Sequence, residues 1–122
     1  MARLKPLESD IHKQVANYLD LTLPVSSVWS TIGHGGMPLH PRTAARLKAQ
    51  GLKPGIPDVL IVWQGRAIFV EIKRPGGRLS PAQKAMHERI TSAGAVVTTC
   101  FSAEDVERYL SVIMPLRATV AA

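Results

Sequence analysis

Apolar residues near the start of the chain follow the spacing of one helix face. They recur with a 3.6-residue period at Leu7, Ile11, Val15, Tyr18 and Leu19. The pattern ends before Pro24, a residue that stops helices. We therefore expect an amphipathic helix from residue 7, preceded by a short basic arm over residues 1–6.

The strongest strand signal lies in the middle of the chain, over residues 55–73. Two short runs rich in Val, Ile, Phe and Trp flank Gln64-Gly65, which predicts a β-hairpin with its turn there. A loop of two or four residues pairs Trp63 with Arg66 and continues to Asp58 opposite Glu71. An odd-length loop with a bulge would shift the register by one residue and move one carboxylate to the other face.

Residues 25–32 and 95–101 read as further strands, and three more segments read as helices. A helix is expected over residues 41–50, with Gly51 as its stop. Ser80-Pro81-Ala82-Gln83 forms a capping box that starts a helix ending at Gly94. Ser102 caps a last helix whose apolar stripe is Val106, Tyr109, Leu110 and Ile113.

The order of these elements predicts one α/β domain over residues 7–113, with a loose tail over residues 114–122. The hairpin strands are apolar on both faces, so we expect helices on both sides of the sheet. A chain of 122 residues is long enough for a single core. The single cysteine, Cys100, excludes an internal disulfide, and the absence of a CxxC pair argues against a structural zinc site.

The hairpin register brings three charged side chains together at the end of two apolar strands. Asp58 and Glu71 face each other, and Lys73 lies on the same face as Glu71 because side chains alternate along a strand. At about 5 Å and an effective dielectric of about 20, the two carboxylates repel by roughly 3 kcal/mol. A divalent cation would offset that repulsion. The alternative is that Asp58 caps a turn and Glu71 pairs with Lys73 at a solvated strand end.

The charge balance points to a polyanionic partner. The net charge is +6, and residues 42–89 hold ten Lys and Arg residues against Asp58, Glu71 and Glu88. Two of those three acids are the candidate metal ligands, so the remainder of the segment is almost purely cationic. This distribution suits a nucleic-acid backbone.

The spacing of several motifs resembles that of a known family. Gly51, Gly55-Ile56-Pro57-Asp58, Glu71-Ile72-Lys73, Leu79-Ser80-Pro81-Ala82-Gln83, Gly94 and Ser102-Ala103-Glu104-Asp105 resemble the VRR-NUC branch of the PD-(D/E)XK nucleases. The similarity covers roughly residues 7–110. It implies a restriction-endonuclease-like fold, a central mixed sheet whose β-hairpin carries the active site, with helices on both faces.

The resemblance also implies roles for particular residues. Asp58, Glu71 and the carbonyl of Ile72 would hold Mg²⁺ or Mn²⁺, and Lys73 would act on the attacking water. Glu8 matches by position a family glutamate that reaches the metal site, although a first-turn glutamate is also favoured by the helix dipole. The expected substrate is DNA, branched as in a Holliday junction or a flap, and the expected assembly is a homodimer.

Further residues are candidates for DNA contact. Gln83 has a structural role in the capping box, and the family carries a glutamine there, so both roles stay open. Glycine-flanked His34 either contacts substrate or is merely exposed. The basic candidates, which lie on the helix over residues 41–50 or in loops beside the hairpin, are Arg42, Arg46, Lys53, Arg74 and Arg78, with Lys48 a weaker candidate; each is alternatively a solvated surface charge.

Two rival functions fit parts of the pattern. A DNA-binding module derived from a nuclease fold would bind DNA without cutting it. A structural or partner-binding α/β domain would bind DNA weakly or without salt dependence. The sequence suggests no small-molecule cofactor and no membrane span, and we expect a cytosolic protein of a bacterium or a phage-infected cell.

Overall fold

The computed structural model describes residues 7–33 and 39–117. The elements in chain order are α1 (Glu8–Thr22), β1 (Val28–Thr31), α2 (Pro41–Ala49), β2 (Val59–Trp63), β3 (Arg66–Ile72), α3 (Pro81–Ser92), β4 (Val96–Cys100) and α4 (Ala103–Ser111). Each predicted helix and strand is present, with β1 shorter than the expected strand over residues 25–32. The predicted arm over residues 1–6 and His34 lie outside the described residues.

The four strands form one mixed sheet in the order β1-β2-β3-β4. The β2-β3 hairpin has the predicted register, from Trp63 opposite Arg66 to Val59 opposite Val70. Its turn has two residues, Gln64 and Gly65, both with positive φ, as a tight hairpin turn with primed geometry requires. Strand β4 joins β3 in parallel, which makes the sheet mixed and confirms the expected α/β class.

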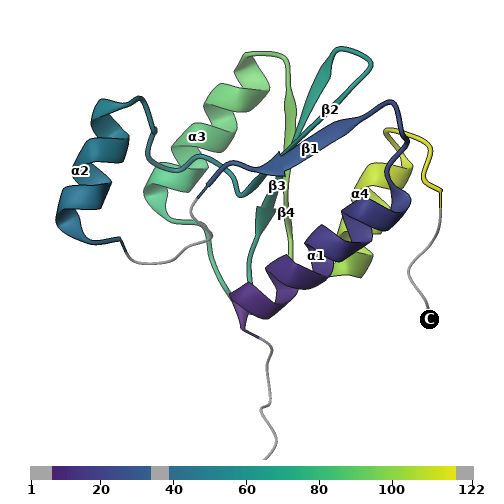
Figure 1. The fold of residues 1–122 in the computed structure, drawn as a ribbon, viewed down its shortest axis with the longest axis horizontal. Helices are drawn as coiled ribbons and strands as arrows, with labels where there is room; N and C mark the ends of the chain where they lie inside the picture. Colours follow the sequence, from purple (N-terminus) through teal and green to yellow (C-terminus); the bar gives the residue numbers. More distant parts are fainter. Residues whose placement is uncertain (1–6, 34–38, 118–122) are drawn as a thin grey trace, which may run out of the picture.

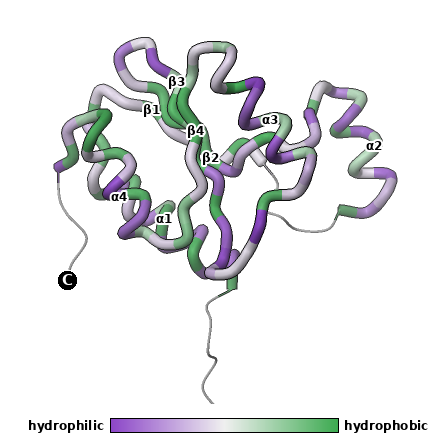
Figure 2. Tube along the Cα trace, turned by 180° about the vertical axis from the view of Figure 1, so that it is seen from behind, coloured by the Kyte–Doolittle hydropathy of each residue, from purple (hydrophilic) through white to green (hydrophobic). Residues whose placement is uncertain are grey.

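Helices cover both faces of the sheet, as predicted (Figure 1). Helices α1 and α4 pack together on one face, and α3 packs on the opposite face beside β4. The main core lies between the sheet and the α1-α4 pair and is built from Ile11, Val15, Leu19, Val59, Ile61, Ile68, Val70, Ile72, Val106 and Leu110. The central strands are the most hydrophobic part of the chain (Figure 2).

The segment after α4 is attached to the domain rather than loose. Met114 is buried in the main core. The Arg117 backbone N–H donates to the Thr22 carbonyl at 2.7 Å, and its guanidinium donates to the Asp20 carbonyl at 3.0 Å. The expected loose tail is therefore anchored to α1 through Arg117, and residues 118–122 lie outside the described part.

No helix in residues 7–33 and 39–117 has the length and apolar character that crossing a membrane requires.

Candidate active site

A glycine turn against α3 delivers Asp58 to the head of β2. Gly55 has φ +79°, and a Cβ there would lie 2.2 Å from the Ala82 carbonyl oxygen. Only glycine permits this backbone conformation and this close approach together. The Asp58 carbonyl accepts from the backbone N–H of Ile32 at 2.9 Å, which fixes the segment to the end of β1.

The two acids of the hairpin lie together, as the register predicted. Asp58 Oδ2 accepts from the Ile72 backbone N–H at 2.7 Å, so the Asp58 side chain reaches across to the end of β3. Asp58 and Glu71 line the same cleft, yet their exposed fractions are only 7% and 1%. Acids are seldom this buried without a specific partner or function.

The proximity of these carboxyl groups changes the titration of Glu71. Burial, a hydrogen bond to Asp58 and the Asp58 charge raise the pKa of Glu71 to about 9, against the lowering effect of Lys73. One proton is therefore retained by the pair near neutral pH when no cation is bound. A divalent cation would replace that proton and relieve the repulsion.

Helix α3 supplies two residues that hold Glu71 in place, Gln83 and His87, and its N-cap residue Ser80 fixes Gln83. The His87 Nε2 atom lies 3.1 Å from Glu71 Oε1, and Gln83 Nε2 donates to Glu71 Oε2 at 3.5 Å. The other end of the Gln83 amide accepts from the Ser80 backbone N–H at 2.8 Å, and Ser80 Oγ accepts from the Gln83 N–H. Gln83 thus both caps the helix and contacts the candidate ligand.

The role of His87 was not predicted from the sequence. A signal existed, because His87 lies four residues after Gln83 and so shares its face of the helix. Burial and the nearby Lys73 lower the pKa of His87, which favours the neutral imidazole beside the carboxyl pair.

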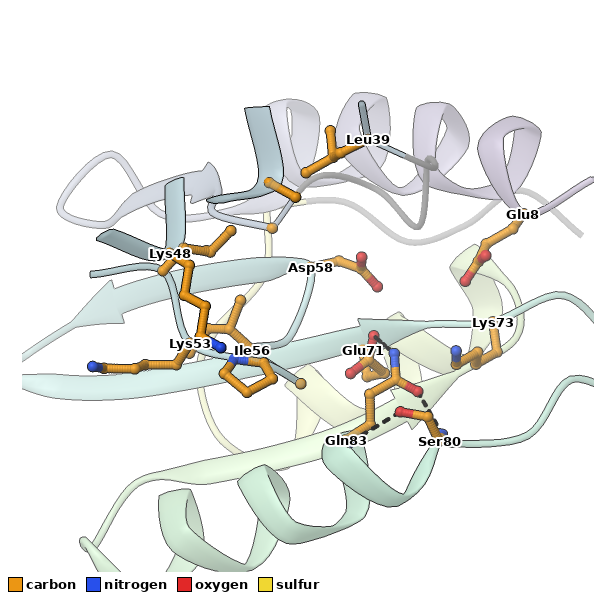
Figure 3. A pocket seen from close by; sticks show the side chains of 15 residues that line it. Glu8, Leu39, Lys48, Lys53, Ile56, Asp58, Glu71, Lys73, Ser80 and Gln83 are labelled. Atoms are coloured by element: carbon orange, nitrogen blue, oxygen red, sulfur yellow. Dashed lines mark hydrogen bonds between the residues drawn. The ribbon is translucent and has the colours of Figure 1, made fainter. Parts of the chain in front are cut away.

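Lys73 and Glu8 complete one end of the cleft, where both side chains point inward (Figure 3). Burial raises the pKa of Glu8, while Lys73 lowers it and Asp58 raises it. The charges of the hairpin site therefore act on the Glu8 carboxyl group across the cleft, although Glu8 belongs to α1.

Of the basic residues predicted to contact DNA, some line the cleft and others lie on the surface outside it. Lys53 lines the cleft, as does Lys48 of α2. Arg42 and Arg46 are exposed on α2 outside the cleft lining, and the two loop arginines predicted after β3, Arg74 and Arg78, are also exposed outside it. The charge of Arg74 still lowers the pKa of Glu8.

The donor set fits a hard divalent cation with few protein ligands. Within the described ranges, no three His, Cys, Asp or Glu side chains are grouped to hold one ion. A cation held by Asp58 and Glu71 would therefore need backbone, water or substrate oxygens as further ligands. Mg²⁺ is commonly bound in this way, by one or two carboxylates together with waters and phosphates.

Comparison with known proteins gives a family match and similar solved folds. The family model of the VRR-NUC domain matches residues 8–104. A solved structure described as a VRR_NUC domain protein is similar, with 20% identity, a TM-score of 0.62 and coverage of 88% of this chain and 87% of the other. Another, described as a VRR_NUC domain, has 21% identity, a TM-score of 0.58 and coverage of 88% and 97%. No curated protein sequence matches.

Proposed function

Because this chain belongs to the VRR-NUC domain family, we propose that it is a metal-dependent nuclease that hydrolyses phosphodiester bonds in DNA. The observation that carries the proposal is the pair of buried carboxyl groups, Asp58 and Glu71, which share a cleft with Lys73. Burying two neighbouring acids at a strand end costs desolvation or repulsion, a cost that a purely structural domain does not need.

Asp58 and Glu71 would hold Mg²⁺ or Mn²⁺, with the carbonyl of Ile72 as a backbone ligand. Glu8 is not grouped with this pair around one ion, so it would join the ligands of that ion only by moving closer, or would hold a second ion. The chemistry supplied by the bound cation is polarisation of the scissile phosphate and activation of water as the nucleophile. The hydrogen bond from the Ile72 N–H orients Asp58, and that from Gln83 orients Glu71.

Lys73 is the general base or the electrostatic partner of the reaction. As a neutral amine it would take a proton from the attacking water, whereas as an ammonium group it would orient that water and offset negative charge that develops on the phosphate. The exposed arginines Arg42, Arg46, Arg74 and Arg78, together with Lys53 in the cleft, would contact DNA phosphates on either side of the cut.

We propose branched DNA as the preferred substrate and a homodimer as the active form, with two sites on one junction. An exposed apolar surface on the edge of the sheet is a candidate contact surface for a second copy of this chain. Val28 of the edge strand β1 and its partner Val62 on β2 are 71% and 42% exposed, and Val25 just before β1 is 88% exposed. Sedimentation of wild type and of Val28→Lys tests this: a dimer that dissociates in the variant supports it, and a monomeric wild type contradicts it.

The decisive test of the activity is cleavage of labelled linear, flap and four-way DNA with Mg²⁺, with Mn²⁺ and with EDTA. We expect Asp58→Asn, Glu71→Gln and Lys73→Met each to lose ~100-fold or more of the cleavage rate while DNA binding persists. Glu88→Gln and Lys13→Met, on exposed helix surfaces, are the matched controls and should cut normally. Metal-dependent cleavage retained in all three site variants would contradict the proposed site, and binding without cleavage by wild type would favour a DNA-binding module.

A further inference from the structure

The cleft extends well beyond the carboxyl groups. Its volume is about 400 Å³, within the range of pockets that enclose small ligands. The lining also includes the apolar residues Leu39, Ala44, Leu52 and Ile56. Of these, Ile56 lies at the end remote from Glu8 and Lys73, called the apolar end below (Figure 3). Lys48 and Lys53 lie at this same end (Figure 3). A phosphate and a cation use the acidic end but leave the apolar end without a partner.

Helix α2 forms one wall of this apolar end and is otherwise poorly explained by packing. None of its residues is buried, although Ala44 faces the cleft. It lies outside the main layers of the fold, beyond α3 (Figure 1). The wall at Gly55 is packed tightly, because Gly55 contacts the backbone of α3 directly. The cleft is therefore a built cavity with one wall that packs against little else.

The chemistry of the lining suits one nucleotide better than a length of duplex. A nucleobase offers flat faces that pack on apolar side chains, while its phosphate belongs at the acidic, cation-binding end. The lysines at the apolar end suit the phosphate of a neighbouring nucleotide. Bases inside a duplex are stacked and paired, and so cannot enter the cavity without unstacking, which costs least for a base that is already unpaired.

We propose that the apolar end of this cleft receives the base of one unpaired nucleotide next to the scissile phosphate, with α2 as its outer wall. The substrate is then DNA with a single-stranded segment at the cut, such as a flap or an opened junction. This inference rests on the proposed function, since it takes the carboxyl pair as the place of the scissile phosphate.

Abasic scanning tests the proposal on the unaltered protein. Single-stranded and flap oligonucleotides, each with one abasic nucleotide at successive positions, are bound in Ca²⁺ and cut in Mg²⁺. Loss of one stacked base should weaken binding by about tenfold at a single position beside the cut and have little effect elsewhere. A uniform response along the strand would overturn the proposal, because phosphate contacts do not depend on the base.

Two neighbouring alanines of α2 provide a matched pair of variants. Ala44→Phe fills the apolar end of the cleft, whereas Ala45→Phe adds the same ring at an exposed position outside the lining. We expect Ala44→Phe to lose about tenfold in binding and its position-specific abasic effect, and Ala45→Phe to behave as wild type. Equal behaviour of the two variants overturns the proposal, and thermal denaturation verifies that both are folded.

The nucleotide pocket and the nuclease activity can be overturned separately. A wild type that cuts DNA in Mg²⁺ with no position-specific abasic effect leaves the nuclease assignment intact and overturns the nucleotide pocket. A wild type that does not cut, but binds with a single abasic-sensitive position lost in Ala44→Phe, supports the pocket and overturns the nuclease.

Discussion

Replacing Glu71 by Gln should stabilise the metal-free protein at alkaline pH, and in the proposed site it should also weaken metal binding. The folded-state pKa of Glu71, about 9, lies above its ordinary value of 4.5. The folded state therefore binds more protons than the unfolded state between these values. The stability associated with this group is fully present below pH 4.5 and is lost as the pH rises toward about 9.

The size of the effect follows from the pH interval and the contacts. From pH 6 to pH 8.5, about 1.4 kcal/mol per pH unit gives an upper limit of roughly 3 kcal/mol. Water in the cleft and the charge of Lys73 reduce this, so about 1–2 kcal/mol is expected. The glutamine keeps its hydrogen bonds, because its oxygen accepts from Gln83 and its NH₂ group donates to neutral His87.

Urea unfolding in EDTA at pH 6 and pH 8.5 measures this difference. We expect wild type to lose stability over this interval and Glu71→Gln to lose about 1–2 kcal/mol less, with Glu88→Gln following wild type. Added Mg²⁺ should remove most of the wild-type loss by stabilising the ionised pair. Equal pH dependence of wild type and Glu71→Gln would refute the assignment of a proton to the carboxyl pair.

Three further predictions concern the frame around the site. Gly55→Ala should lower the free energy of unfolding in urea by more than about 2 kcal/mol, because its Cβ would meet the Ala82 carbonyl. Gly65→Ala, which has positive φ but nothing within 4 Å of its Cβ, should lower it by about 1 kcal/mol. Equal losses would contradict the close packing at Gly55. Ser80→Ala should lose about 1 kcal/mol of stability with the helix cap and also lower the cleavage rate, and an unchanged rate would separate the cap from the site. Burial raises the pKa of Cys100 to about 12, so iodoacetamide should label it at pH 8 only after unfolding, and rapid labelling of the native protein would contradict its buried place.

Local patterns sufficed for the elements and for the pairing of the hairpin. The turn at Gln64-Gly65 and the alternation of side chains fixed which carboxyl groups face each other, because register is a local consequence of turn length. The capping box at Ser80 was likewise readable from four consecutive residues. The strand predicted over residues 25–32 is longer than β1 because Val25, the one apolar residue in that range before Val28, is exposed and lies outside the strand pairing.

Contacts between distant elements were beyond the reach of these patterns. The bond between His87 and Glu71 depends on how α3 lies against the sheet, and the attachment of Arg117 to α1 depends on the packing of α4. The placement of α2 over the cleft depends on the path of the chain from β1 to β2, which no residue periodicity encodes.

The sequence by itself determined the class of fold, the family of the protein and the pairing of Asp58 with Glu71, since short-range stereochemistry and spacing carry that information. Only the tertiary structure decided how buried the pair is, how far its titration shifts and what cavity adjoins it. Burial and electric field are sums over side chains brought together from the whole chain, so they exist only once the elements have packed.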